Sequence, residues 1–594
     1  MESAKKKSII NCHTHIFNGK CVPPYIVKGF MPWPLYYLVH TPTLLRINEF
    51  FKFKDGKWKE FYEKWRILKI LLGNVWIKYR TFLYRNIIAK TIAIIINTWF
   101  ILHALYYLFA SQIGNLIRSF EYLDRNVRSL ISYLESNNAF FRNPHILYKV
   151  LIILFVLIFI SIGRKLLWTI ARYILPLMKF VPDSKTLKFY LRYFNIIRFA
   201  GYEESFRVYS KLINQYDHGT GFVVLPMDMH YVGAGKIKSK EGTFEFQMNE
   251  LVKLKSDKNK KIYPFVFIDP RRIKDQSDFL KISGDPTTGI VMLKDCLVKE
   301  YIETNKLNGF KIYPALGYYP FDEELLLLWK YAADHQIPIM THVIKGTVFY
   351  RDDKKKEWDY HPVFEQYNGK GQPTSPLMLP ELKNIDFSAN FTHPLNYLCL
   401  LDEKLLRKVV KNCRKEIKEF FGYSDDSTEL KHNLSKLKIC MGHYGGDEEW
   451  AKYQERDRLA QVSNLLRIER DGFDFFPNDY DMLGPKNGYL GDIWKSFDWF
   501  SIITNLMYKY KNVYADISYI VHNPTIYPLL KQILGKDELK DRVLYGTDFF
   551  VVRNHKSEKQ LLSEVMANLT EEEFDLIARD NPRAYLKTSY CTIN

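Results

Sequence analysis

The chain of 594 residues is long enough for one large domain or for a domain that carries an inserted subdomain. Its formal net charge of +19 favours contact with anionic lipid headgroups or an acidic substrate. The chain has no zinc-finger, helix-turn-helix or RNP-like motif, which argues against nucleic acid as the partner, and its seven cysteines form no CxxC pair and no disulfide framework.

The first predicted element is a strand that ends in two histidines. Residues 8–15 form a short apolar run that closes with His13-Thr14-His15. Side chains alternate along a β-strand, so His13 and His15 lie on one face and both can reach one metal ion. For this motif alone, a histidine pair in a loop is the alternative, and the later elements decide between the two.

A large segment separates this strand from the next strand-like run. Residues 20–216 far exceed the loops of about 2–6 residues and the single helix that usually join neighbouring strands of an α/β fold. They contain two apolar stretches, about 91–117 and 146–163, and the first has no Asp, Glu, Lys or Arg. The first stretch exceeds the roughly 20 residues needed to cross a bilayer. We therefore predict a helical insertion with two candidate transmembrane segments.

Two spans would return the chain to the side of the membrane on which it started. This return is required, because the first strand precedes the insertion and the other strands follow it. Residues 64–85 mix aliphatic, aromatic and basic side chains, which is typical of a helix in the membrane interface or of a helix that buries its apolar face on the protein. No secretory signal opens the chain, so we expect the catalytic domain to face the cytoplasm. A soluble helical hairpin packed on that domain is the alternative.

Seven more strand-like runs follow the insertion. Three of them end in residues that can bind a metal ion, namely His342, His443 and Asp548. Helical patterns lie between the runs, as in residues 321–335, where apolar residues recur at helical spacing. The runs are 222–225, 262–268, 310–313, 337–342, 437–443, 512–517 and 542–548.

Eight strands that alternate with helices predict an α/β fold, a (β/α)8 TIM barrel with the helical insertion between its first and second strands. The domains are then 1–19, the first strand; 20–216, the insertion; and 217–594, the rest of the barrel. The active site of such a barrel lies at the C-terminal ends of the strands, where the histidines and the aspartate would converge. Residues 350–390 are expected to form a long loop over this face.

The order of these residues resembles the amidohydrolase superfamily. It is most similar to the amidohydrolase-related branch, which includes enzymes like aminocarboxymuconate-semialdehyde decarboxylase. The likeness covers residues 8–19 and roughly 217–590 and leaves 20–216 unexplained. It rests on His13, His15, His342, His443 and Asp548 at strand ends, on Gly309–Pro314 and on Asn581–Leu586.

The resemblance implies a metal centre and two catalytic groups. His13, His15, His342 and Asp548 would surround one divalent ion, and three imidazoles with one carboxylate suit zinc. Asp548 would also take a proton from water activated by the metal. His443 would polarise the substrate or protonate the leaving group.

Four further residues are weaker candidates. In two-metal members of the superfamily a lysine on the fourth strand is carbamylated and bridges the ions, so Lys311 would allow a second ion; a substrate-binding or salt-bridge lysine is the alternative. Asp228 and Arg271 lie near predicted strand ends, where a guanidinium could hold a substrate carboxylate. A turn aspartate and a structural ion pair are the alternatives for these two. His393 resembles a family element at the start of a helix and is a candidate pocket residue.

We expect a membrane-anchored, metal-dependent hydrolase that uses metal-activated water on an amide, ester or ring C–N or C–O bond. Non-oxidative decarboxylation or hydration on the same metal site is one alternative, and a non-catalytic membrane sensor or structural partner is another. The substrate is expected to be a small molecule, and contact with membrane lipid favours an amphiphilic one. The identities of the substrate and the metal, the number of ions and the oligomeric state do not follow from the sequence.

Overall fold

The computed structural model divides into two compact units. One consists of Met1–Phe50 and Lys188–Asn594, and the other of Phe51–Leu187. The residues that the structure describes are 7–17, 19–30, 35–37, 40–50, 57–118, 121–141, 144–160, 165, 204–257, 260–346, 348–367, 373–379, 381–455, 489–549 and 555–590.

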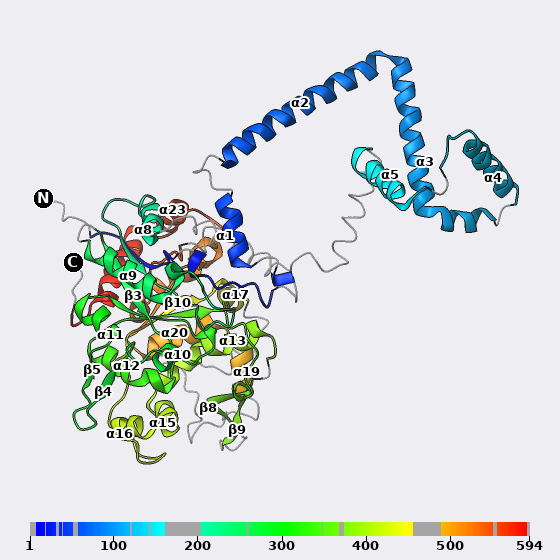
Figure 1. The fold of residues 1–594 in the computed structure, drawn as a ribbon. Helices are drawn as coiled ribbons and strands as arrows, with labels where there is room; N and C mark the ends of the chain where they lie inside the picture. The colour runs from blue at the N-terminus through cyan, green and yellow to red at the C-terminus, as the bar shows by residue number, and fades with distance from the viewer. Residues whose placement is uncertain are drawn as a thin grey trace. The chain divides into compact units, whose positions relative to one another are not determined.

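The larger unit is built around one parallel sheet of eight strands (Figure 1). The strands follow the order β1-β2-β3-β6-β7-β10-β11-β12. The sheet closes between its last and first strands, because the Cys12 N–H donates to the Tyr545 carbonyl over 2.8 Å and the Asp548 N–H donates to the His13 carbonyl over 2.9 Å. The strands are β1 (Ile10–Thr14), β2 (Gly221–Val224), β3 (Ile262–Phe267), β6 (Gly309–Ile312), β7 (Ile339–Ile344), β10 (Ile439–Gly445), β11 (Val513–Asp516) and β12 (Val543–Leu544). The predicted (β/α)8 barrel and its eight strands are therefore confirmed.

Helices join the strands and cover the outside of the barrel (Figure 1). The helix predicted within residues 321–335 is α12 (Glu323–Asp334), which begins where the Asp322 side chain accepts from the Glu324 N–H. The other described helices of this unit are α1 (Thr41–Phe50), α8 (Ser205–Ile213), α9 (Phe244–Ser256), α10 (Pro270–Asp275), α11 (Leu297–Lys299), α13 (Asn384–Thr392), α14 (Leu398–Leu401), α15 (Glu403–Lys411), α16 (Lys415–Phe421), α17 (Asp447–Gln454), α19 (Tyr489–Ser496), α20 (Trp499–Lys509), α21 (Tyr527–Leu534), α22 (Asp537–Lys540), α23 (Glu558–Asn568), α24 (Glu571–Asp575) and α25 (Asn581–Leu586).

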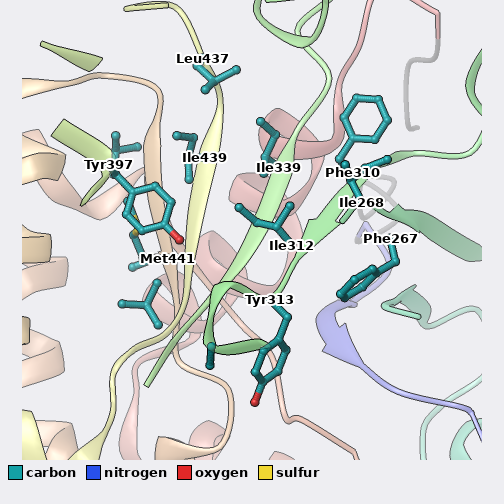
Figure 2. Packing of buried hydrophobic residues seen from close by; sticks show 14 of the residues in the cluster. Phe267, Ile268, Phe310, Ile312, Tyr313, Ile339, Tyr397, Leu437, Ile439 and Met441 are labelled. Atoms are coloured by element: carbon teal, nitrogen blue, oxygen red, sulfur yellow. The ribbon is translucent and has the colours of Figure 1, made fainter. Parts of the chain in front are cut away.

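Side-chain alternation along the strands separates two apolar layers. Phe310 and Ile312 of β6 belong to the large cluster between strands and helices, and Figure 2 shows Ile312, Ile339 and Ile439 on neighbouring strands of that layer. The alternate residues point into the barrel, where a second cluster is closed by two residues of α25. Its members are Ile10, Cys12, Val223, Leu225, Phe265, Met340, Cys440, Tyr514, Leu544, Tyr585 and Leu586. The same alternation directs Lys311 of β6 into the barrel.

Two antiparallel hairpins are added to the barrel. One joins β4 (Ile282–Gly284) to β5 (Val291–Leu293), and the other joins β8 (Tyr360–Tyr367) to β9 (Pro373–Met378). The expectation of a long loop over residues 350–390 is wrong, because the second hairpin lies there. Val363, Phe364 and Leu377 of this hairpin are buried in the main core, which explains why the segment forms strands despite its charges and glycines.

The flanks of the predicted insertion pack with the barrel unit. Cys21, Val22 and Ile26 are buried in its core, and the Tyr25 N–H donates to the Ala234 carbonyl over 2.9 Å. On the other side of the insertion, α8 buries Leu212 in the same core. The separate unit is therefore shorter than residues 20–216, because these flanking apolar residues are buried with the barrel.

The smaller unit is helical. α3 and α5 pack through Ala104, Val156 and Ile160. Large apolar side chains are exposed along α2, from Trp65 to Tyr84, and along α3. Its described helices are α2 (Lys57–Arg85), α3 (Ile87–Arg118), α4 (Glu121–Ser136) and α5 (Ile146–Phe159).

One helix among the described residues is long and apolar enough to cross a membrane. It covers Ile87–Leu108 in α3, and 11 % of its most apolar window is buried. The stretch Ile146–Leu157 in α5 is apolar but shorter. The two predicted spans thus fall on α3 and α5, and residues 161–163 of the second lie outside the described part of the chain.

Candidate metal centre

Ionisable side chains from six strands meet at the C-terminal end of the barrel. All are between 0 and 8 % exposed: His13, His15, Lys311, His342, His443, Asp516 and Asp548. Two groups of three within this cluster have ligand atoms within 4.8 Å of one another, His13 with His15 and Asp548, and His13 with His443 and Asp516. Three of the four predicted ligands, His13, His15 and Asp548, are therefore close enough to share an ion, whereas His342 belongs to neither group.

Backbone geometry makes room for this cluster. A Cβ on Gly442 would lie 2.4 Å from the Thr341 carbonyl oxygen, and one on Gly546 would lie 2.9 Å from the Cβ of His13. His443 and Asp548 have φ angles of 66° and 60°, a left-handed conformation that non-glycine residues seldom adopt. Such strain at strand ends is typical of functional sites, where the surrounding structure enforces it.

The hydrogen-bond partners of His13 and His15 determine which ring nitrogen carries the proton. Burial by itself raises the pKa of Asp516, but His13, His443 and Ser518 hold that pKa well below its usual range. The ionised Asp516 therefore accepts from His13 Nδ1–H over 2.9 Å. His15 Nδ1–H donates to the Leu225 carbonyl over 2.8 Å. Both Nε2 atoms are then left with a lone pair.

These lone pairs face the centre of the cluster. His15 Nε2 lies 3.3 Å from Asp548 Oδ1. Burial raises the pKa of Asp548, but His15 and its neighbours lower it to about 2, so this oxygen belongs to a carboxylate. A lone pair and a carboxylate at this distance require a cation or a proton between them. Within the described residues, His13 Nε2 is buried without a hydrogen-bond partner.

His342 and His443 form a second imidazole pair. His443 Nε2 lies 3.1 Å from His342 Nδ1, and the His342 ring stacks on Tyr313 with centroids 3.9 Å apart. Burial lowers the pKa of His342 well below its usual value and that of His443 to about 3, so both rings are neutral at pH 7. His342 Nε2 has no hydrogen-bond partner in the described part of the chain.

The donor set fits a divalent metal ion. It offers the carboxylate of Asp548 and the Nε2 atoms of His13, His15 and His342. None of these three Nε2 atoms accepts a hydrogen bond from another described residue. Neutral imidazoles with a carboxylate bind zinc, and borderline ions such as manganese or iron use similar sets. His13, His15 and Asp548 form a candidate metal site with His342 beside it, and the donor types do not select zinc over the other ions.

Gly346 allows a test of the metal position that changes no ligand. A Cβ at this residue would lie 2.9 Å from His342 Nε2 and 3.3 Å from the Tyr313 hydroxyl. The added methyl group would displace His342 Nε2. Because losing a contact that orients a ligand costs about 10- to 100-fold in metal affinity, we expect Gly346→Ala to lower metal affinity by at least about tenfold. Competition with a fluorescent chelator measures this affinity. Gly491→Ala is the control, because its Cβ would meet only Leu377 at 3.8 Å, and equal affinities for both variants would contradict the assignment.

Lys311 is the buried cation of the cluster. Burial lowers its pKa to about 8, and among the described residues its Nζ has no hydrogen-bond partner. Asp516 and Asp548 are close enough to favour its charged form. Lys311 thus lies where the sequence predicted a bridging or substrate-binding lysine.

The other candidates are engaged elsewhere. Asp228 accepts from Arg272 Nε over 2.5 Å. Arg271 binds both oxygens of Asp269, at 2.9 and 2.6 Å, as a structural ion pair would. His393 stacks on Trp494 with ring centroids 3.9 Å apart. No hydrogen bond, ion pair or ring contact within the described residues joins Asp228, Arg271 or His393 to the metal centre.

Two residues of the site, Asp516 and Ser518, are not among the predicted ones. Residues 512–517 were expected to be a strand without a metal-capable end, although Asp516 is the last residue of β11. The available signal was an acidic residue at the end of an apolar strand, in the same place as Asp548 on the next strand. Ser518 carried no signal of its own.

The closed barrel and the buried histidine–aspartate cluster define a metal-binding (β/α)8 protein. Solved structures similar to this chain include 2,6-dihydroxybenzoate decarboxylase from Rhizobium, at 13 % identity, covering 64 % of this chain and 87 % of that chain with a TM-score of 0.32. Dihydroxybenzoic acid decarboxylase from Polaromonas, with bound manganese, has 12 % identity, covers 69 % and 92 %, and has a TM-score of 0.33. An amidohydrolase from Mycobacterium avium has 14 % identity, covers 70 % and 81 %, and has a TM-score of 0.28. No protein-family model and no curated protein matches the chain.

The chain's own barrel and strand-end residues agree with the fold expected from the sequence. His13 in β1, His15 just after it, the histidines of β7 and β10 and the aspartate after β12 occupy the predicted places. The arrangement of the barrel and these residues resembles the amidohydrolase superfamily, as expected from the sequence.

Proposed function

We propose that this protein is a metal-dependent hydrolase of the amidohydrolase type, anchored in a membrane, that cleaves an amide, ester or ring C–N or C–O bond. The supporting observation is the lone pair of His15 Nε2 at 3.3 Å from the Asp548 carboxylate, with the Nε2 atoms of His13 and His342 buried in the same cluster. When bound there, the ion would supply a Lewis acid that polarises the substrate and acidifies water.

The protein's own groups would orient the reactants and move the proton. Asp548 is ionised and its Oδ1 faces His15 Nε2 at 3.3 Å, so its second oxygen is the expected acceptor for a proton from the attacking water. His443 is neutral and its Nε2 contacts His342 Nδ1. His443 could protonate a leaving group only after this contact opened and Nε2 took up a proton, and in the closed arrangement His443 orients His342.

Elemental analysis of the purified protein tests this function. We expect about one divalent ion per chain, lost in His342→Ala and kept in Lys311→Ala, which is the mononuclear arrangement of three histidines and a carboxylate. Two ions per chain, with one lost in Lys311→Ala, would make Lys311 a bridging ligand. A protein that takes up no ion under metal-replete conditions would reject the enzyme proposal and favour a non-catalytic membrane partner.

Non-oxidative decarboxylation is the second candidate, and Lys311 favours it. A fully buried ammonium group beside the metal ligands offers an anchor for a substrate carboxylate. Under this function, 2,6-dihydroxybenzoate or a related aromatic acid would release carbon dioxide, and Lys311→Met would raise KM more than it lowers kcat. Release of an amine or alcohol from neutral substrates, with no carbon dioxide from aromatic acids, would favour hydrolysis.

We further propose that α3 anchors the protein in a membrane with the barrel in the cytoplasm. Ile94, Ile95 and Leu102 of α3 are 55, 62 and 54 % exposed, which is costly in water and favourable in lipid. α2 carries Lys69 and Arg80 among exposed apolar residues, a composition that suits an interface with anionic headgroups. An enzyme held at a bilayer has ready access to amphiphilic substrates.

A further inference from the structure

Asp516 is the centre of a buried hydrogen-bond network. Its Oδ2 accepts from His13 Nδ1 over 2.9 Å. Its Oδ1 accepts from the backbone N–H groups of His443, over 3.1 Å, and Ser518, over 2.9 Å, and also from the Ser518 hydroxyl. Both oxygens are therefore occupied as acceptors, and Asp516 is 0 % exposed.

The direction of each further hydrogen bond follows from the one before it. The single hydroxyl proton of Ser518 goes to Asp516, so Ser518 Oγ can only accept from His443 Nδ1, 2.9 Å away. His443 then carries its proton on Nδ1 and has a lone pair on Nε2. That lone pair accepts from His342 Nδ1–H over 3.1 Å, which leaves the lone pair of His342 on Nε2.

We propose that Asp516 is a positioning residue that sets the tautomers of three histidines: His13 directly, His443 through Ser518, and His342 through His443. The inference rests on the proposed metal centre, because its consequence is that the Nε2 atoms of His13 and His342 present lone pairs to the ion. In the other tautomer an N–H would point at the ion, and the imidazole could not bind it.

One contact separates this role from that of a metal ligand. Asp516 belongs to a group with His13 and His443 whose ligand atoms lie within 4.8 Å, which by distance alone would also suit an ion. However, the 2.9 Å contact between Asp516 Oδ2 and His13 Nδ1 is a hydrogen bond and leaves no room for an ion between these atoms. His15 lies outside the network, because the Leu225 carbonyl sets its tautomer.

Asparagine at position 516 breaks the network wherever its amide points. Its NH2 group would face either His13 Nδ1 or the Ser518 and His443 donors, so at least one branch loses its acceptor. We expect Asp516→Asn, in the full-length protein, to bind Zn²⁺ and Mn²⁺ about 10- to 100-fold more weakly in competition with a fluorescent chelator. Ser518→Ala keeps the His13 branch and breaks only the branch to His443 and His342, so we expect a smaller loss of affinity than in Asp516→Asn.

Asp269→Asn is the matched control. Asp269 is also a fully buried carboxylate at the C-terminal end of a barrel strand, but its partner is Arg271. Its replacement should destabilise the fold to a similar degree and leave metal affinity unchanged. Equal losses of affinity in Asp269→Asn and Asp516→Asn would overturn the proposal, as would wild-type affinity in Asp516→Asn.

Nitrogen-15 NMR of histidine-labelled, metal-free protein tests the tautomers without any variant. The proposal requires neutral His13, His342 and His443 rings that are protonated at Nδ1, and signals of the Nε2–H tautomer for these rings would overturn it. Ser518→Ala should disturb the signal of His443 and leave that of His13 in place. Wild-type protein that binds no metal would reject the proposed function instead, so the two failures are distinguishable.

Discussion

His15→Ala is expected to remove the divalent ion and to abolish turnover. The variant deletes an imidazole whose Nε2 faces Asp548 and whose tautomer is fixed by the Leu225 carbonyl. Binding of a ligand to the folded state at about 100 times Kd stabilises a protein by about 2.7 kcal/mol. The wild-type protein should therefore melt at a higher temperature when metal is added, and His15→Ala should lose most of this increase. Differential scanning fluorimetry with and without metal measures it.

His230→Ala is the control for this experiment. His230 is exposed and follows β2 on the same end of the barrel, so it reports non-specific metal binding by surface histidines. It should keep the full metal-dependent increase in melting temperature. If His15→Ala also keeps that increase, the ion binds elsewhere and the proposed ligand set is wrong.

Replacement of two apolar residues of α3 by arginine is expected to release the protein from membranes. Ile95 and Leu102 are exposed, so Ile95→Arg with Leu102→Arg should change the stability of a helix in water by only about 0.5 kcal/mol per site. In a bilayer, a charge near the centre of a span costs about 2.5–3.5 kcal/mol, or about 5–7 kcal/mol for two. Carbonate extraction of membranes, followed by detection of the protein in pellet and supernatant, measures the difference.

Ile290→Arg serves as the comparison for the arginine variant. Ile290 is 57 % exposed between β4 and β5 in the barrel unit, so an arginine there adds charge without touching the proposed span. This variant should stay in the pellet. Wild-type protein found entirely in the supernatant would reject the anchor, and the soluble hairpin would then be the better description of α3 and α5.

The sequence indicated most of the metal centre because its ligands follow a local rule. Each strand is a short apolar run, and the polar residue that ends it must lie at the C-terminal end of a parallel barrel. His342, His443 and Asp548 could be placed by this rule before any contact was known. Asp516 ends β11 in the same way, and it was missed because its strand was identified by apolar residues alone.

Other features depend on contacts that no local pattern contains. The hairpin of β8 and β9 forms because Val363 and Phe364 are buried in the main core, a burial that the charges and glycines of the segment do not reveal. The insertion was recognised from its length and apolar composition. The limits of the insertion could not be recognised in this way, since Cys21 and Val22 pack with residues that are distant in sequence.

The sequence by itself indicated the barrel, its eight strands and the candidate metal ligands at strand ends, because strand periodicity and strand ends are local properties. Only the tertiary structure decided how each imidazole is oriented. The tautomers depend on hydrogen bonds between residues such as His13 and Asp516, which are 503 positions apart and meet only when the barrel closes. The orientation of each imidazole therefore depends on the closed sheet, whereas the candidate ligand residues can be recognised from each strand separately.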